Sequence, residues 1–191
     1  HVVEHLLKNT DWEIVVLDRL DLPGTLERLT DMEIWEKEKY RVKFICHDLT
    51  GPINQFLEKE MGDINYILHL AASTNVDESI ENPMKYVMNN VVGTTNLLLY
   101  ARKLPNLKKL VNFNTDEAFG PAPIGISHKE TEPFRPSNPY SGSKVGQFGM
   151  GYSFFITYKL PVISTFTMNN FGERQDSRKL IPKCIRCVVN Q

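Results

Sequence analysis

The chain has 191 residues, 41% of them hydrophobic, and a formal net charge of −1. These values predict one globular domain with a substantial core, and they exclude a disordered chain and a basic nucleic-acid-binding domain. No apolar run approaches the roughly 18 residues of a membrane span, and no signal peptide opens the sequence, so we expect no membrane partner.

The hydrophobic pattern, followed along the chain, predicts helices that alternate with short buried strands. A turn is expected at residues 21–24, followed by a polar helical stretch that continues through Glu38. Such alternation predicts parallel strand–helix–strand units and a doubly wound α/β sheet, in which ligands bind beyond the carboxyl ends of the strands. The predicted helices are residues 1–8, 52–60, 83–102 and 140–158, and the predicted strands are 14–17, 42–46, 66–70, 109–114 and 162–166.

The three cysteines do not make a disulfide framework, which fits a reducing compartment such as the cytoplasm. Cys184 and Cys187 have the spacing of a metal or redox pair, but there is no second pair, and they lie on an apolar segment of helical character. We therefore interpret them as helix packing and expect no metal site. Cys46 stands alone.

Tyr140 and Lys144 stand four residues apart, directly after a Pro-rich stretch that favours a helix start. On a helix the two side chains share one face. A tyrosine has a pKa of about 10, and a nearby ammonium group favours the phenolate. The pair therefore predicts an acid/base tyrosine whose pKa Lys144 lowers. The alternative is a surface tyrosine and lysine that have this spacing by chance.

Acidic and small residues follow several predicted strands. A carboxylate at Asp18 can accept hydrogen bonds from the ribose hydroxyls of a dinucleotide and would repel a 2′-phosphate, which favours NAD over NADP. Arg19 weakens that preference. Asp48 ends the next strand, where it can meet an adenine edge, and Ala71-Ala72 allows a cofactor close to the backbone. Either aspartate could instead be a solvated acid.

Thr115-Asp116-Glu117 follows the strand 109–114 directly. A hydroxyl and two adjacent carboxylates at the end of a parallel strand are hard to explain by packing. This cluster therefore predicts a functional site. Five further segments occur with it in one order: His69-Leu-Ala-Ala-Ser-Thr-Asn-Val-Asp-Glu-Ser79, Asn90-Val-Val-Gly-Thr94, Asn138-Pro-Tyr-Ser-Gly-Ser-Lys144, Asn169-Asn-Phe-Gly172 and Lys179-Leu-Ile-Pro182.

Together these segments resemble the motifs of the extended short-chain dehydrogenase/reductases, the NAD-dependent epimerase/dehydratase family. They are most similar to its nucleotide-sugar 4,6-dehydratases of the dTDP-glucose type. The resemblance covers essentially the whole chain and implies a Rossmann-like fold. Thr-Asp-Glu is the discriminating motif, because related decarboxylases and GDP-mannose dehydratases tend to carry Thr-Ser-Glu, and C4 epimerases carry small residues there.

The resemblance implies conversion of a nucleotide-activated hexose to a 4-keto-6-deoxy sugar, with NAD recycled at each turnover. Tyr140 would take the C4 hydroxyl proton, Glu117 the C5 proton, and Asp116 would protonate the departing C6 hydroxyl. Lys144 would hold the nicotinamide ribose, and Thr115 would hydrogen-bond near the tyrosine. The implied cofactor-binding residues are Asp18, Asp48, Leu70, Ala71, Ala72, Thr74, Tyr140 and Lys144; the implied substrate-binding residues are Asn75, Asn169, Lys179 and Leu180, with Asn90 supporting the site. A homodimer built on the two long helices is also implied.

Three positions depart from the motifs of the resembled family. Phe119 replaces a tyrosine and Asn114 a serine, while Asn75 stands where histidine is common and leaves the substrate subtype open. Glycines are also unusual inside a helix, where each costs up to about 1 kcal/mol relative to alanine. The segment 146–151 resembles a phosphate-binding loop but follows no strand, so we interpret its glycines as close helix packing at a dimer interface.

The resembled family opens with a strand and a Gly-x-x-Gly-x-x-Gly turn that holds a pyrophosphate. No such motif follows a strand here. We therefore expect a fragment without that strand, that turn and most of the substrate-binding domain, and we expect it alone neither to bind NAD well nor to turn over. Residues 1–168 would form the truncated NAD-binding domain and residues 169–191 the start of the substrate-binding region. The alternatives are a C4 epimerase or decarboxylase of the same family, or a non-catalytic Rossmann-fold binding module.

Overall fold

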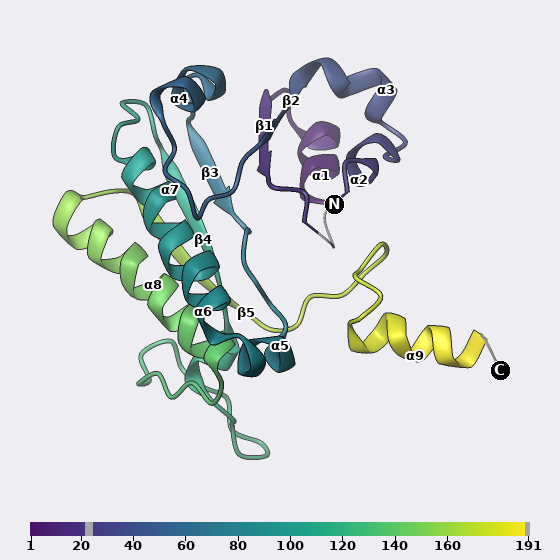
Figure 1. Cartoon of the computed structure of the whole chain (residues 1–191), viewed down its shortest axis with the longest axis vertical. Coiled ribbons are helices and arrows are strands. Elements are labelled where there is room, and N and C mark those ends of the chain that lie inside the picture. The colour runs from purple at the N-terminus through teal and green to yellow at the C-terminus, as the bar shows by residue number, and fades with distance from the viewer. Residues whose placement is uncertain (22–24, 190–191) are drawn as a thin grey trace.

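The structure is a computed structural model that describes residues 1–21 and 25–189 (Figure 1). Its strands pair in parallel and form two sheets, one with the order β1-β2 and one with the order β3-β4-β5. The strand bounds are Ile14–Asp18 for β1, Val42–Cys46 for β2, Tyr66–His69 for β3, Lys109–Thr115 for β4 and Val162–Thr167 for β5. The turn predicted at residues 21–24 falls largely outside the described residues.

Helices connect the strands, as parallel pairing requires. α7 and α8 lie side by side over one face of the larger sheet, where α8 packs on β4 and β5 (Figure 1). No described helix is both long and apolar enough to cross a membrane. The helix bounds are Val2–Asn9 (α1), Glu27–Thr30 (α2), Trp35–Glu38 (α3), Lys39–Arg41 (η1), Gln55–Met61 (α4), Val76–Glu81 (α5), Pro83–Tyr86 (α6), Val87–Val92 (η2), Gly93–Ala101 (α7), Asp116–Phe119 (η3), Pro139–Tyr158 (α8) and Leu180–Val189 (α9).

Two hydrophobic clusters hold these layers together. One joins β2, α4 and α7 through buried side chains that include Ile45, Met61 and Leu97. The other packs α7 and α8 on β4 through Leu98 and Leu110, which are 0% and 1% exposed. Burial of apolar surface is the main stabilising contribution to a fold of this kind. The carboxyl end of β4 is thereby fixed relative to the start of α8.

Two of the helical glycines mark close contacts of α8. A Cβ atom on Gly146 would lie 2.8 Å from Val91 Cγ2, and one on Gly151 would lie 2.9 Å from Asn112 Nδ2. Close packing of α8 is therefore confirmed at these two positions, but against η2 and β4 of the same chain, so these contacts do not test the predicted dimer interface. Gly142 and Gly149 have nothing within 4 Å of a Cβ, so packing against a neighbour within the chain does not explain them.

The prediction of parallel strand–helix units in a Rossmann-like fold is confirmed, but two helical features differ from it. The predicted helix 83–102 contains a π-helical turn, η2, between α6 and α7. α5 was not predicted, although Asn75 caps it by accepting a hydrogen bond from Glu78 N at 2.9 Å. Both features lie beside the candidate site.

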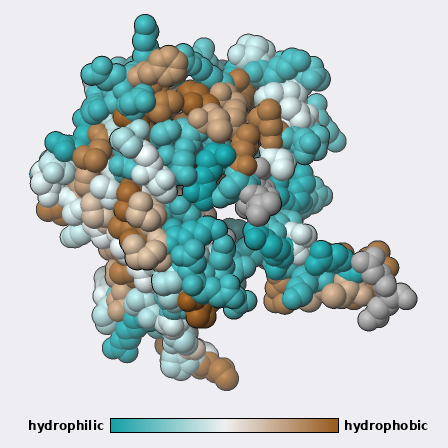
Figure 2. Space-filling view, in the orientation of Figure 1, coloured by the Kyte–Doolittle hydropathy of each residue, from teal (hydrophilic) through white to brown (hydrophobic). Residues whose placement is uncertain are grey.

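The described strands also form two sheets instead of one continuous sheet, because β1 and β3 are not paired with each other. A groove of about 750 Å³ lies between these strands, and its lining includes side chains of α1. Figure 2 shows apolar surface gathered in the upper part of the molecule, over the region of these sheets in Figure 1. Leu68 and Ile163 alternate with inward-facing neighbours and are 37% and 45% exposed, so helices leave the opposite face partly open there.

Candidate active site

β4 delivers Thr115, Asp116 and Glu117 to the carboxyl end of the larger sheet. β4 ends at Thr115, whose hydroxyl accepts a hydrogen bond from Glu117 N at 3.3 Å and so caps η3. The same hydroxyl donates to Asp116 Oδ1 at 3.3 Å. Thr115 is 7% exposed, and both carboxylates are half-buried. This turn holds two acids beside one hydroxyl at the strand end.

The start of α8 is built to place Tyr140 against that turn. Asn138 caps the helix by accepting from Ser141 N at 2.8 Å, and Ser141 Oγ accepts from Asn138 N at 3.2 Å. Asn138 Nδ2 also donates to Glu117 Oε2 at 3.3 Å. The backbone N–H of Tyr140 donates to Ser79 Oγ at 3.1 Å. One capping residue therefore joins the helix that carries the tyrosine to the carboxylate of Glu117.

The protonation of Tyr140 differs from the sequence-based prediction. Burial raises the pKa of the phenol above its ordinary value, and the nearby carboxylates of Glu117 and Asp116 raise it further, while a hydrogen bond with Thr115 acts in the opposite direction. The prediction that Lys144 lowers this pKa was wrong for the chain by itself. The reason is that Lys144 directs its ammonium group elsewhere.

Lys144 is 4% exposed and turned toward the sheet. Its Nζ donates to Phe113 O at 2.7 Å and to Gln147 Oε1 at 2.6 Å. Burial lowers the pKa of Lys144 to about 8, because desolvation penalises the ammonium form. The structure therefore brings Lys144 and Tyr140 to one end of α8 but gives the ammonium two neutral acceptors instead of the phenol.

The π-helical turn η2 places Asn90 where it supports the loop after β3. Asn90 is fully buried; its Oδ1 accepts from Ser73 N at 2.7 Å, and its Nδ2 donates to Ser73 O at 3.0 Å and to Ser143 Oγ at 2.8 Å. The amide thus links the loop that follows β3 to α8. π-helical turns occur frequently at functional sites.

His69 lies at the end of β3 with 3% exposure. Thr94 Oγ1 donates its proton to Asn90 O at 2.6 Å, so the 2.8 Å contact between His69 Nε2 and Thr94 Oγ1 requires the proton on Nε2. Burial, together with the charge of Lys144, lowers the pKa of His69 to about 3. The imidazole is therefore neutral and serves to join β3 to α7.

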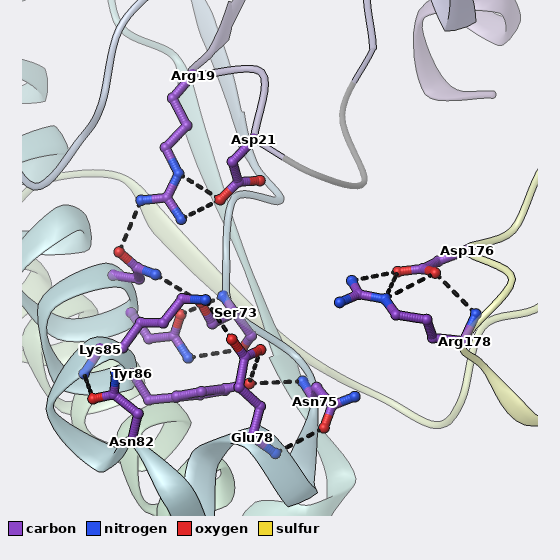
Figure 3. Close-up of polar contacts among 12 residues, drawn as sticks. Arg19, Asp21, Ser73, Asn75, Glu78, Asn82, Lys85, Tyr86, Asp176 and Arg178 are labelled. Atoms are coloured by element: carbon purple, nitrogen blue, oxygen red, sulfur yellow. Dashed lines mark hydrogen bonds and ion pairs between the residues drawn. The ribbon is translucent and has the colours of Figure 1, made fainter.

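The acidic residues after β1 and β2 lie around Arg19. Its Nε donates to Asp21 Oδ2 at 2.8 Å and its Nη1 to Asn89 Oδ1 at 3.0 Å (Figure 3). Nη1 also donates to Asp48 Oδ2 at 3.2 Å. Partial burial opposes ionisation of Asp48, but hydrogen bonds from Thr50 and Arg19 outweigh it and lower the pKa. The guanidinium is thus already engaged by protein acceptors.

Asp18, the last residue of β1, is exposed and accepts a hydrogen bond from Leu20 N at 2.8 Å through one oxygen. The groove between the two sheets reaches Asp18 and also Leu70 and Ala71 after β3. Ala72 follows as a half-buried small residue. The structure therefore places these candidate cofactor residues along one edge, where the strands end.

The candidate substrate residues do not form one cluster. Lys179 Nζ donates to both Thr74 O and Thr74 Oγ1 at 3.1 Å, which ties the segment before α9 to the loop after β3. Asn75 lies beside them as the cap of α5, and its N–H donates to Tyr86 Oη at 3.2 Å (Figure 3). Asn169 and Leu180 are exposed, and Leu180 is 75% exposed. Neither reaches the Thr115–Glu117 turn through a hydrogen bond within the described residues.

Cys184 and Cys187 lie on α9, as predicted, but both are exposed, and α9 buries none of its residues. The interpretation as helix packing was therefore wrong within the described residues, because α9 projects away from the two sheets (Figure 1). No group of three or more metal-ligating side chains occurs among residues 1–21 and 25–189.

Three polar residues around the site received no role in the sequence analysis: Asn138 and Ser79, which lie within the quoted motif segments, and Gln147. Asn138 had a signal, because Asn-Pro before a helical pattern is a typical capping sequence. Ser79 had none, since it reaches Tyr140 N from 61 positions away. Gln147 stands three residues after Lys144 and therefore on the same side of α8, but its burial came only from packing.

Comparisons with known proteins agree with this arrangement. The family described as GDP-mannose 4,6 dehydratase matches residues 1–191. The dTDP-glucose 4,6-dehydratase of Salmonella typhimurium is 33% identical over 201 residues, which cover 96% of this chain and 55% of that protein.

Solved structures share the fold. A dTDP-glucose 4,6-dehydratase, DesIV, from Streptomyces venezuelae, crystallised with NAD bound, superposes with a TM-score of 0.86 at 29% identity, over 99% of this chain and 56% of that one. A UDP-N-acetylglucosamine 4-epimerase from Methanobrevibacter ruminantium has a TM-score of 0.83 at 28% identity. The match covers 100% of this chain and 58% of that one. The chain thus spans little more than half the length of these three proteins.

Proposed function

Because the chain belongs to the GDP-mannose 4,6-dehydratase family, we propose that the intact protein is an NAD-dependent nucleotide-sugar 4,6-dehydratase. The observation that carries the proposal is the Thr115–Glu117 turn, which sets two half-buried carboxylates beside the phenol of Tyr140. A dehydration that follows oxidation needs a base and an acid in addition to the tyrosine that takes the hydroxyl proton during oxidation. Two adjacent acids supply them.

The residues at the strand ends fit a dinucleotide. Asp18 offers an exposed carboxylate at the end of β1, and Ala71 and Ala72 leave room near the backbone after β3. Arg19 is occupied by Asp21, Asp48 and Asn89, so it is not free for a 2′-phosphate. These features support NAD over NADP. Leu70 and Thr74 border the same edge and would complete the cofactor site, together with Tyr140 and Lys144.

In the proposed reaction Thr115 turns its hydroxyl proton from Asp116 to the phenolate of Tyr140, which accepts the proton of the C4 hydroxyl. NAD, when bound, supplies the hydride acceptor and donor. The C4 ketone acidifies the C5 proton, which Glu117 removes while Asn138 holds its carboxylate. Asp116 protonates the C6 hydroxyl, which leaves as water. C6 then receives hydride from the reduced cofactor, and Glu117 returns the proton to C5. The product is a nucleotide-linked 4-keto-6-deoxyhexose.

Two other functions remain as competing outcomes. The similarity to a solved 4-epimerase supports a C4 epimerase, as does the fact that epimerisation needs only a tyrosine and cofactor of this kind. The two carboxylates beside Tyr140 favour dehydration, since epimerisation gives them no proton to move. A non-catalytic binding module would have no packing reason to keep these ionisable groups together.

The substrate segment is proposed to begin near residue 169, after the domain formed by residues 1–168. Asn169, Lys179 and Leu180 lie in that segment, and Asn75 lies opposite it beside Thr74. Their exposure suits contact with a nucleotide sugar or with a further part of the protein. We also propose a cytoplasmic homodimer, which the three free cysteines and the exposed apolar side chains of α7 and α8 support.

The decisive experiment offers dTDP-, UDP-, GDP- and CDP-hexoses to the intact protein with NAD and measures the alkali-induced absorbance of a 4-keto-6-deoxy product. We expect product from one nucleotide and a loss of about 10²- to 10⁴-fold in Glu117→Gln. Glu130→Gln, the same change at an exposed position of a nearby loop, is the matched control and should retain activity. Interconversion of C4 epimers alone would identify an epimerase, and no reaction with any sugar would favour the binding module.

A further inference from the structure

Gln147 is a fully buried amide at the centre of the α8–β4 contact, with 0% exposure. Its Nε2 donates to Asn112 Oδ1 at 2.6 Å and to Phe113 O at 3.3 Å. Its Oε1 accepts from Lys144 Nζ at 2.6 Å. An uncharged side chain that uses both ends of its amide in a dry interior is held in one orientation, because turning it over would leave donors facing donors.

Asn112 in turn has no freedom to move. It is 1% exposed, its Nδ2 donates to Gln147 O at 3.4 Å, and the same nitrogen lies where a Cβ on Gly151 would approach within 2.9 Å. The glycine therefore makes room for Asn112, and Asn112 fixes Gln147. Side chains locked in this way hold a functional group in place more firmly than surface contacts do.

We infer that Gln147 is a positioning residue for Lys144, whose ammonium group it fixes beside Phe113 O while leaving the positive charge uncompensated. The inference rests on the proposed function, in which Lys144 serves the proton transfer at Tyr140. Phe113 O and Gln147 Oε1 satisfy two of the three donors of the ammonium, and the third remains for a ligand hydroxyl or the phenol. A carboxylate at position 147 would keep an acceptor for Lys144 Nζ and cancel the charge, but it would lose the donor that Gln147 Nε2 offers to Asn112 Oδ1 and Phe113 O.

The charges of the other ionisable groups near Lys144 determine the electrostatic potential at its ammonium group. His69, from β3, is neutral and buried. Asp116 and Glu117, from η3, act on Tyr140, which lies on the same helix as Lys144. Asn112, which joins α8 to β4, and Thr94, which joins α7 to β3, carry no charge. Gln147 is therefore the position where one added charge would act most directly on Lys144.

The test measures the titration of Lys144 itself, from the pH dependence of its Cε NMR signal in protein labelled with [¹³C]lysine, with Lys144→Arg assigning the signal. Gln147→Glu should raise the pKa of Lys144 by about 1 to 3 units, the usual effect of a contacting opposite charge. Gln147→Met removes the acceptor at similar size and should lower the pKa further. This readout does not depend on activity, so it stands even if no nucleotide sugar is converted.

The pH profile of product formation is the second readout. Gln147→Glu should move the acid limb to higher pH, because a neutralised Lys144 leaves the phenol of Tyr140 harder to ionise. Phe154→Leu, a buried change elsewhere on α8, is the control for lost stability, and it should move neither the titration nor the profile. If Gln147→Glu does not fold, the test rests on Gln147→Met, in which the pKa of Lys144 should be lower than in the unchanged protein. An unchanged Lys144 titration in the folded Gln147 variants, or an equal shift in Phe154→Leu, would overturn the inference.

Discussion

Three ionisable side chains near the carboxyl ends of β3 and β4 have pKa values that burial shifts. The pKa of Tyr140 is raised, and those of Lys144 and His69 are lowered. In each case the low-dielectric interior disfavours the charged form. Tyr140 is therefore held as a neutral phenol in the chain alone, and formation of the phenolate depends on a hydrogen bond with Thr115 and on positive charge brought close to it.

At the scale of single residues, His69 gives a pH prediction. Its folded pKa of about 3 lies below the unfolded value of about 6.5, so the unfolded chain takes up a proton first as the pH falls. The stabilising contribution of the neutral imidazole is complete above pH ~6.5 and is lost toward pH ~3, at up to about 1.4 kcal/mol per pH unit. Urea unfolding at pH 7 and pH 4.5 should show this loss.

His69→Gln should unfold with a smaller difference between the two pH values, because the uncharged amide does not titrate. His5→Gln, at an exposed position of α1, is the matched control and should behave like the unchanged protein. Equal pH dependence in both variants and the unchanged protein would show that another group governs acid unfolding.

At the scale of elements, the start of α8 couples helix stability to the site. Asn138→Ala removes the side-chain cap and should lower the free energy of unfolding by about 1 kcal/mol. Asn138→Asp keeps a capping oxygen but replaces the Nδ2 donor that Glu117 Oε2 contacts at 3.3 Å. The aspartate variant should therefore retain stability while product formation falls, because a like charge raises the pKa of the neighbouring carboxylate.

Thermal unfolding and product formation measured on both Asn138 variants separate the two roles. Parallel losses of stability and activity in both variants would contradict the coupling to Glu117.

The π-helical turn η2 also orients side chains toward the site, since its extra residue turns both Asn89 and Asn90 toward Ser73. A regular α-helix over residues 87–92 would present these two side chains differently.

At the scale of the whole molecule, α8 exposes an apolar surface away from the sheet. Tyr152, Phe155 and Ile156 share one helix face by their spacing and are 46–55% exposed, and Leu99 of α7 is 44% exposed. Exposed apolar patches of this kind mark protein–protein contacts. We predict that Phe155→Glu converts the proposed homodimer to a monomer, as measured by light scattering.

Ile124→Glu is the control for that experiment, because Ile124 lies fully exposed in the loop before α8 and off the two helices. It should leave the mass of the particle unchanged. A monomeric unchanged protein, or a dimer that survives Phe155→Glu, would exclude this face as the interface.

The sequence by itself determined the parallel strand–helix order, the family and the candidate residues of the Thr115–Glu117 turn. Strand periodicity, strand-end acids and the Tyr140–Lys144 spacing are local signals, and the family resemblance drawn from the motifs is confirmed. The boundaries of β1 to β5 also followed closely from the apolar runs. These features depend on neighbours within a few residues, which a sequence displays directly.

Only the tertiary structure decided where the polar groups point. The partners of Lys144 lie on β4 and one turn along α8, Tyr140 N meets Ser79 across 61 positions, and Arg19 joins three segments. The separation of β1 from β3 likewise depends on pairing between distant strands. Hydrogen bonds and burial between remote segments set the pKa values and most of these contacts; only the Lys144–Gln147 pair follows from residue spacing.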